Sequence, residues 1–146
     1  MIRARARRIV RAVYAFRCGY CGVTEAQVGS ELTFDHFRPQ SRGGPDDVAN
    51  LVYACHACNE FKGEYWAESD DTRLLHPLTD DLTQHIVEEK NSTLRPLTAL
   101  GQVYLDRLQL IPGTRFGPGD PREPQRQNPQ HLGAGRECCL PAKLIP

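Results

Sequence analysis

CGYC at residues 18–21 and CHAC at residues 55–58 decide the fold of this 146-residue chain. In each pair the two-residue spacer lets both thiolates reach one ion from a single turn. Two such pairs on one Zn2+ would tie a hairpin and a helix together, and in a domain this small the metal would replace part of the hydrophobic core. The predicted ligands of this structural zinc site are Cys18, Cys21, Cys55 and Cys58.

The remaining candidate ligands are weaker. Cys138 and Cys139 are adjacent, which makes them poor partners for one ion, so we interpret them as incidental thiols. His56 lies inside the second pair and is expected at the surface of a helix start, outside the metal site. Cys pairs at this spacing favour metal over disulfide in a reducing compartment.

Composition sets limits on the class of protein. The 18 basic and 18 acidic residues balance, so net charge alone does not indicate nucleic-acid binding. The first 24 residues, however, carry six arginines and no acid, which is compatible with a surface that faces phosphates. No stretch resembles a secretory signal or a membrane span, and we expect a cytoplasmic protein.

The segment between the cysteine pairs predicts a β-β-α unit. We expect a short strand at residues 32–34 that leads into Asp35-His36, and a second at residues 51–54. A loop rich in turn-forming residues would join them, and a helix would run from the second cysteine pair to about Trp66. Before the first pair, residues 2–16 have a helical pattern with Ile9, Val13 and Phe16 near one face and Val10 and Tyr14 beside it. That helix would pack on the domain, contact DNA, or do both.

The rest of the chain divides into two parts. Residues 67–111 are expected to form a helical extension, with a helix over 97–110 whose aliphatic stripe packs into the core. Residues 112–146 are rich in proline and glycine and are expected to be disordered. Residues 1–66 would then form the principal domain.

The order of the polar and glycine residues in this domain resembles the HNH endonuclease family over roughly residues 8–66. The shared pattern is Cys-x-x-Cys, Asp-His-x-x-Pro, Gly-Gly, Asn-Leu and Cys-x-x-Cys-Asn-x-x-Lys-Gly, and every element is present here. The resemblance implies a small α+β fold, namely a ββα-metal, treble-clef-like domain that a four-cysteine zinc site holds together. A weaker downstream likeness includes 75-LHP-77 and 97-LTALG-101.

The resemblance also implies a role for each site residue. His36 would be the general base, and Asp35 and Asn59 would bind a catalytic Mg2+ or Mn2+ ion. Asn50 would brace the loop after His36. The chemistry agrees, since a neutral imidazole accepts a proton at cellular pH and carboxylate and amide oxygens suit Mg2+. The expected phosphate contacts are Arg38, Arg42 and Lys62.

Each of these roles has an alternative. Asn59 would also be at home as a polar residue at a helix start, and Asn50 as a turn residue without catalytic duty. The arginines and Lys62 would otherwise be solvated charges. His76, His85 and His131 are interpreted as structural or incidental.

The predicted activity is a metal-dependent DNA endonuclease that hydrolyses phosphodiester bonds with one metal ion. The alternatives are a non-catalytic zinc module that binds nucleic acid and a zinc platform for protein interactions. One ββα site cuts one strand, so a double-strand cut would require a homodimer or sequential nicks. DNA specificity would be low or supplied by a partner.

Overall fold

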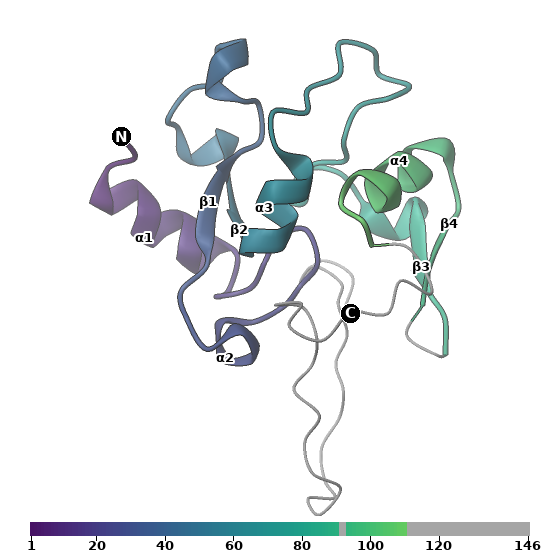
Figure 1. Ribbon diagram of the computed structural model, residues 1–146, viewed down its shortest axis with the longest axis horizontal. Coiled ribbons are helices and arrows are strands. Elements are labelled where there is room, and N and C mark those ends of the chain that lie inside the picture. Colours follow the sequence, from purple (N-terminus) through teal and green to yellow (C-terminus); the bar gives the residue numbers. More distant parts are fainter. Residues whose placement is uncertain (91–92, 111–146) are drawn as a thin grey trace, which may run out of the picture.

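The computed structural model describes residues 1–90 and 93–110 (Figure 1). The expectations for residues 112–146, including Cys138, Cys139 and His131, lie outside this range. The helices and strands are α1 (Ala4–Val13), α2 (Glu25–Val28), β1 (Thr33–His36), β2 (Leu51–Ala54), α3 (His56–Lys62), β3 (Ile86–Glu88), β4 (Leu94–Pro96) and α4 (Ala99–Arg107). Three short 3-10 turns are η1 (Gln40–Arg42), η2 (Val48–Asn50) and η3 (Leu82–Gln84). None of the described helices is long and apolar enough to cross a membrane.

The β1–β2 hairpin is the centre of the fold. The strands are antiparallel, with Thr33 opposite Ala54 and His36 opposite Leu51. All four residues of β2 are buried, because α1 and α3 lie on opposite sides of the hairpin (Figure 1). A strand covered on both faces is apolar throughout, as the sequence of β2 is. The small α+β fold expected from the sequence is therefore confirmed.

Helix α1 uses a different face from the predicted one. Val10 and Tyr14 are buried, whereas Ile9, Val13 and Phe16 are 39–50% exposed. The helix ends at Val13 and Phe16 has a φ of 60°, so Phe16 does not continue the helical stripe. The prediction that Ile9, Val13 and Phe16 lead the inner face is therefore wrong, and Val10 and Tyr14, which were expected beside them, form that face instead.

Tyr14 reaches its buried position because the first cysteine turn leaves room for it. A Cβ atom on Gly19 would lie 2.4 Å from Cε1 of the Tyr14 ring and 2.9 Å from a Val52 methyl group. Gly19 therefore permits α1 to approach the turn closely, and Gly22, with a φ of 77°, lets the chain leave it.

Two predicted helices are shorter than expected. Helix α3 ends at Lys62 rather than near Trp66, because Gly63 takes a φ of 50° that a helix does not allow. Helix α4 begins after Thr98, whose hydroxyl accepts a hydrogen bond of 3.1 Å from the Gly101 N–H and caps the helix. The β3–β4 hairpin before α4 was not predicted, since three-residue strands are too short to show alternation.

The segment after residue 66 packs against the first part of the chain. Tyr104 is buried and donates a hydrogen bond of 2.8 Å to the Tyr20 carbonyl, in the first cysteine turn. Arg107 donates one of 3.0 Å to the Lys62 carbonyl at the end of α3. On the other side of α4, a Cβ on Gly101 would lie 2.0 Å from the His85 carbonyl oxygen. Helix α4 is thus held between the β3–β4 hairpin and the cysteine turn.

Candidate metal centre and active site

The four predicted cysteines meet in one buried cluster. The Sγ atoms of Cys18, Cys21, Cys55 and Cys58 all lie within 4.8 Å of one another. The Cys21 and Cys55 sulfurs are 3.7 Å apart, and a tetrahedral ion with Zn–S bonds of ~2.3 Å would separate its sulfurs by about 3.8 Å. The cluster therefore has the size and donor type to hold zinc.

The backbone contacts of the sulfurs and the pKa values of the thiols also suit metal binding. The N–H groups of Cys21 and Cys58 point to the sulfurs of Cys18 and Cys55, at 3.5 and 3.4 Å. Hydrogen bonding, led by Cys18, raises the pKa of Cys21 and Cys58 and lowers the pKa of Cys55. Cys21, Cys55 and Cys58 thus hold their protons unevenly, and a divalent cation would stabilise the cysteines of the cluster as thiolates.

His56 is not part of the cluster. Its side chain is 83% exposed on the outside of α3, where it lies 3.8 Å from the Glu60 carboxylate. This position agrees with the expectation of a surface residue at the helix start.

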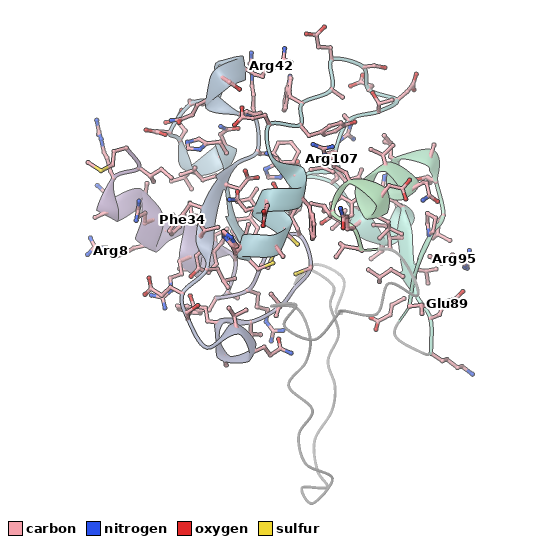
Figure 2. All side chains as sticks on the ribbon, in the orientation of Figure 1. Arg8, Phe34, Arg42, Glu89, Arg95 and Arg107 are labelled. Atoms are coloured by element: carbon pink, nitrogen blue, oxygen red, sulfur yellow. The ribbon has the colours of Figure 1, made fainter. Side chains whose placement is uncertain are left out.

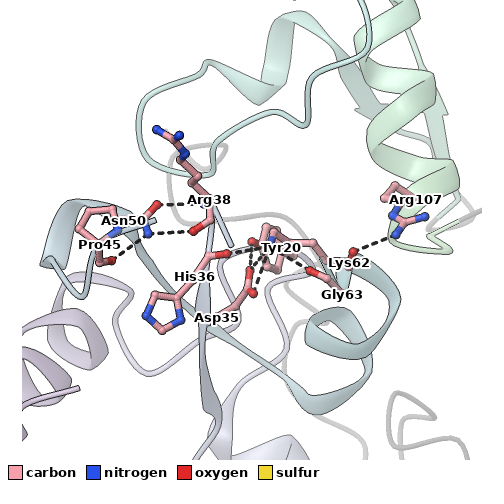
Figure 3. Close-up of polar contacts among 9 residues, drawn as sticks. All are labelled: Tyr20, Asp35, His36, Arg38, Pro45, Asn50, Lys62, Gly63 and Arg107. Carbon is pink, nitrogen blue, oxygen red and sulfur yellow. Dashed lines mark hydrogen bonds and ion pairs between the residues drawn. The ribbon is translucent and has the colours of Figure 1, made fainter. Parts of the chain in front are cut away.

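Asp35 is the third residue of β1, and its side chain is buried in the interior. It is only 6% exposed, and its Oδ2 accepts a hydrogen bond of 2.5 Å from the Tyr20 hydroxyl (Figure 3). The Lys62 ammonium lies 3.1 Å from Oδ1 and 3.0 Å from Oδ2. Burial raises the pKa of Asp35, while the attraction of Lys62 opposes that rise.

Lys62 has a different position from the one predicted. Its side chain is fully buried, and Nζ donates to Asp35, to the His36 carbonyl at 2.8 Å and to the Gly63 carbonyl at 3.4 Å (Figure 3). An ammonium has three protons, so these contacts occupy it fully. The prediction of a phosphate contact is therefore corrected, and so is the alternative of a solvated charge. Lys62 binds the backbone and the carboxylate of the Asp35-His36 dipeptide instead.

His36 has a carboxylate partner that the sequence did not reveal. Its Nε2 lies 2.7 Å from Oδ1 of Asp46, which also accepts a hydrogen bond of 2.9 Å from Gln40. The hydrogen bond to His36 is the main cause that lowers the pKa of Asp46, so the acceptor is ionised and Nε2 carries the proton. Within residues 1–90 and 93–110, Nδ1 of His36 has no hydrogen-bond partner.

Asn50 closes the loop that follows His36. Its amide oxygen accepts from the Arg38 N–H at 2.9 Å, and its amide nitrogen donates to the carbonyls of Arg38 at 3.0 Å and Pro45 at 2.9 Å (Figure 3). Gly44 makes this approach possible, since a Cβ there would lie 1.7 Å from the Arg38 carbonyl oxygen. These contacts brace the loop, and a catalytic role of Asn50 stays a prediction.

Asp35 and Asn59 are the candidate ligands of a working ion. The three contacts to Asp35 leave about one of its four lone-pair sites open. Asn59 lies one turn before Lys62 on α3, and its side-chain amide makes no hydrogen bond to any described residue. Both carry hard oxygen donors of the kind that Mg2+ prefers, and their joint binding of a divalent ion stays a prediction.

The two arginines of the loop are accessible. Arg38 and Arg42 are exposed, and Nε of Arg38 donates to the Arg42 carbonyl at 2.7 Å. Arg42 lies at the tip of the loop (Figure 2). Their positions permit contact with a phosphate, and such contact stays a prediction.

We expect one zinc ion per chain and loss of the fold when it is removed. The binding energy of a structural zinc site is largely folding energy, so a strong chelator should abolish the folded circular dichroism spectrum. Cys58→Ser should lower the zinc content measured by atomic absorption, whereas Cys138→Ser should leave it unchanged. A chain that folds fully without metal would contradict this prediction.

We expect Lys62→Met to destabilise the protein by about 3–5 kcal/mol, because it leaves the Asp35 carboxylate buried and unpaired. Urea unfolding with zinc present measures the change. The control Lys90→Met, at an exposed position, should change stability by no more than about 0.5 kcal/mol.

Removal of both charges provides the second control. The double variant Asp35→Leu/Lys62→Met should be more stable than Lys62→Met alone, since neither charge then remains unpaired. Equal losses in the single and double variants would show that the ion pair is not the cause.

Comparison with known proteins agrees with this arrangement. A family model described as HNH endonuclease matches residues 18–64, which include both cysteine pairs, the Asp35-His36 dipeptide and Asn50. No curated protein and no solved structure matched the chain. Residues 18–64 thus match the HNH endonuclease family, and the four-cysteine cluster lies within that stretch.

Proposed function

We propose that this protein is a metal-dependent endonuclease that hydrolyses DNA phosphodiester bonds with His36 as the general base. The supporting observation is the state of the His36 ring, which Asp46 holds through Nε2 at 2.7 Å. This leaves Nδ1 as a proton acceptor without a partner among the described residues. The nuclease-related family of residues 18–64 supports the reaction class.

The proposed step is a simple displacement. Nδ1 of His36 takes a proton from a water molecule as its oxygen bonds to phosphorus, and the bond from phosphorus to the 3′ oxygen breaks. The imidazolium that forms is stabilised by the ionised Asp46 carboxylate on the other side of the ring. Lys62 keeps the His36 backbone in place through its carbonyl.

Asp35 and Asn59 would hold the catalytic ion, either Mg2+ or Mn2+. When bound, the ion would stabilise the negative charge on the phosphate and on the departing oxygen. The hardness of the two donors supports this assignment. The buried position of Asp35 and its contacts with Tyr20 and Lys62 would limit direct contact to about one oxygen bond.

DNA would approach the exposed loop that carries Arg38 and Arg42. On α1, Arg11 is occupied by Glu25 in two hydrogen bonds of 2.6 and 2.7 Å. Arg8 is exposed at the outer side of α1 and is a further candidate for a phosphate contact (Figure 2). Cleavage of both strands would require a homodimer or a second nick.

One observation favours the second candidate, a nucleic-acid-binding module without catalysis. The Asp35 side chain is almost completely buried, and the fully buried Lys62 ammonium already neutralises its charge. A carboxylate in that state is sufficiently explained by a structural role. Activity therefore decides between the two candidates.

Supercoiled plasmid with Mg2+ or Mn2+ tests the proposal. We expect the wild type to nick the plasmid and His36→Ala to reduce the rate by about 10²- to 10⁴-fold, the range that a general base contributes. His56→Ala is the matched control, because His56 is exposed and outside the site. Binding should be measured in parallel by gel shift.

The outcomes separate the candidates. Equal DNA binding by both proteins with nicking by neither would support the binding module. Absence of DNA binding would leave the zinc fold as an interaction platform.

We expect Asp46→Asn to reduce nicking on the order of 10- to 100-fold, the usual cost of losing the outer partner of a functional histidine. An amide no longer stabilises the imidazolium and does not fix which ring nitrogen carries the proton. Asp47→Asn changes the adjacent exposed carboxylate and is the control. Equal rates in both variants would remove Asp46 from the mechanism.

A further inference from the structure

A hollow of about 400 Å3 lies between the chain that leaves β1 and the loop that follows α3. Three of its lining side chains are aromatic, namely Phe37, Tyr65 and Trp66. Its volume is within the range of small-molecule sites in proteins, about 300–1,000 Å3. Nothing in the proposed hydrolysis uses this hollow.

The walls of the hollow are held in place before any ligand arrives. The Tyr65 hydroxyl donates to the Thr72 carbonyl at 2.6 Å and closes the loop on itself. The Ser41 hydroxyl donates to the Glu64 carboxylate and joins the β1–β2 loop to the chain after α3. The Arg107 guanidinium lies 4.6 Å from the centre of the Tyr65 ring. A preformed site loses little conformational entropy on binding.

Trp66 has the features of a stacking platform. It lies in a loop, it is 36% exposed, and it is the chain's one tryptophan. The Arg38 guanidinium lies 5.6 Å from the ring centre, and the Phe37 ring meets Trp66 edge-on at 6.2 Å. Exposed aromatic and guanidinium planes are the surfaces on which unpaired bases stack.

Apart from Arg38, whose guanidinium lies over the Trp66 ring, the charges in the hollow favour a base over a phosphate. Glu68 and Asp70 also line it, and their carboxylates would repel a phosphate group. The same oxygens accept hydrogen bonds from exocyclic base amines such as N4 of cytosine. Arg73 is already engaged by the Asp80 carboxylate, in hydrogen bonds of 2.7 and 2.9 Å, so it is not available to a phosphate.

The wall of the hollow begins at the residue after the proposed general base. Phe37 directly follows His36, and consecutive Cα atoms are about 3.8 Å apart. In Figure 3, the Arg38 side chain points away from the Asp35-His36 dipeptide, and its guanidinium lies 5.6 Å from the centre of the Trp66 ring. A strand whose phosphate lies at His36 would therefore bring a neighbouring base to the aromatic wall.

We propose that this hollow binds one unpaired nucleobase next to the phosphate that is cut, which gives the protein a preference for DNA with an unpaired base at that point. The inference rests on the proposed function, since it takes the strand at His36 as its starting point. A paired base in a duplex hides both faces in the stack and does not enter such a site without extrusion.

The intrinsic fluorescence of Trp66 tests the proposal directly, because no other tryptophan contributes. The full chain with His36→Ala is titrated, in Ca2+, with a single-stranded oligonucleotide, a duplex with one bulged base and the matched paired duplex. We expect quenching by the first two and little change with the paired duplex. Binding of all three without any quenching would overturn the proposal.

Substitution of Trp66 gives the second measurement. Trp66→Ala should reduce the preference for bulged over paired duplex by about 5- to 150-fold, the range for one lost base–aromatic stack. Trp66→Phe should retain most of the preference. Phe16→Ala, at an exposed aromatic in the turn after α1, is the control, and thermal melting verifies that each variant folds. An equal loss for both duplexes in Trp66→Ala would count against a base site.

These results are independent of the nuclease assay. Plasmid nicking without Trp66 quenching by any DNA would refute the base site and leave the nuclease intact. Quenching by the bulged duplex without nicking would support the base site and refute the nuclease.

Discussion

The convergence of four thiolates on one point is the constraint on which the rest of the structure depends. One pair lies in the turn after α1, and the other begins α3. Because the cluster fixes α3 against the hairpin, Lys62 at the end of that helix comes to lie beneath Asp35. Asp35 and Lys62 are 27 positions apart in sequence and share no local structure. Their contact is a consequence of the cluster, and the position of His36 in turn depends on that contact.

Features encoded by spacing were the ones that the sequence predicted well. Both strands of the central hairpin, the start of α3 and the four-cysteine cluster follow from short patterns with fixed separations. The sequence did not predict which face of α1 is buried. Ile9 and Val13 have the same i, i+4 spacing as the buried pair Val10 and Tyr14. Contact with Gly19 and Val52 decides between these faces, and helical periodicity does not contain that information.

The residues of the candidate site also differ in how well the sequence predicted them. The sequence singled out Asp35, His36 and Asn50 as candidates, because a recognisable motif surrounds each, and their roles stay predictions. It did not identify Asp46, which stands in a run of turn-forming residues where an acid is ordinary. Lys62 was in the motif but received the wrong role, since the exposure of a lysine depends on partners that come from elsewhere in the chain. Motifs indicate which residues matter, whereas tertiary contacts determine what they do.

The hydrogen bonds from Tyr104 and Arg107 have a consequence for where the domain ends. They connect α4 to the carbonyls of Tyr20 and Lys62, both inside the stretch that the family model matches. A fragment that stopped at residue 64 would keep every motif residue but would uncover the buried side of Tyr20 and leave those carbonyls to water. The boundary of the recognisable sequence and the boundary of cooperative folding are therefore different. A minimal version of this protein would have to extend through α4.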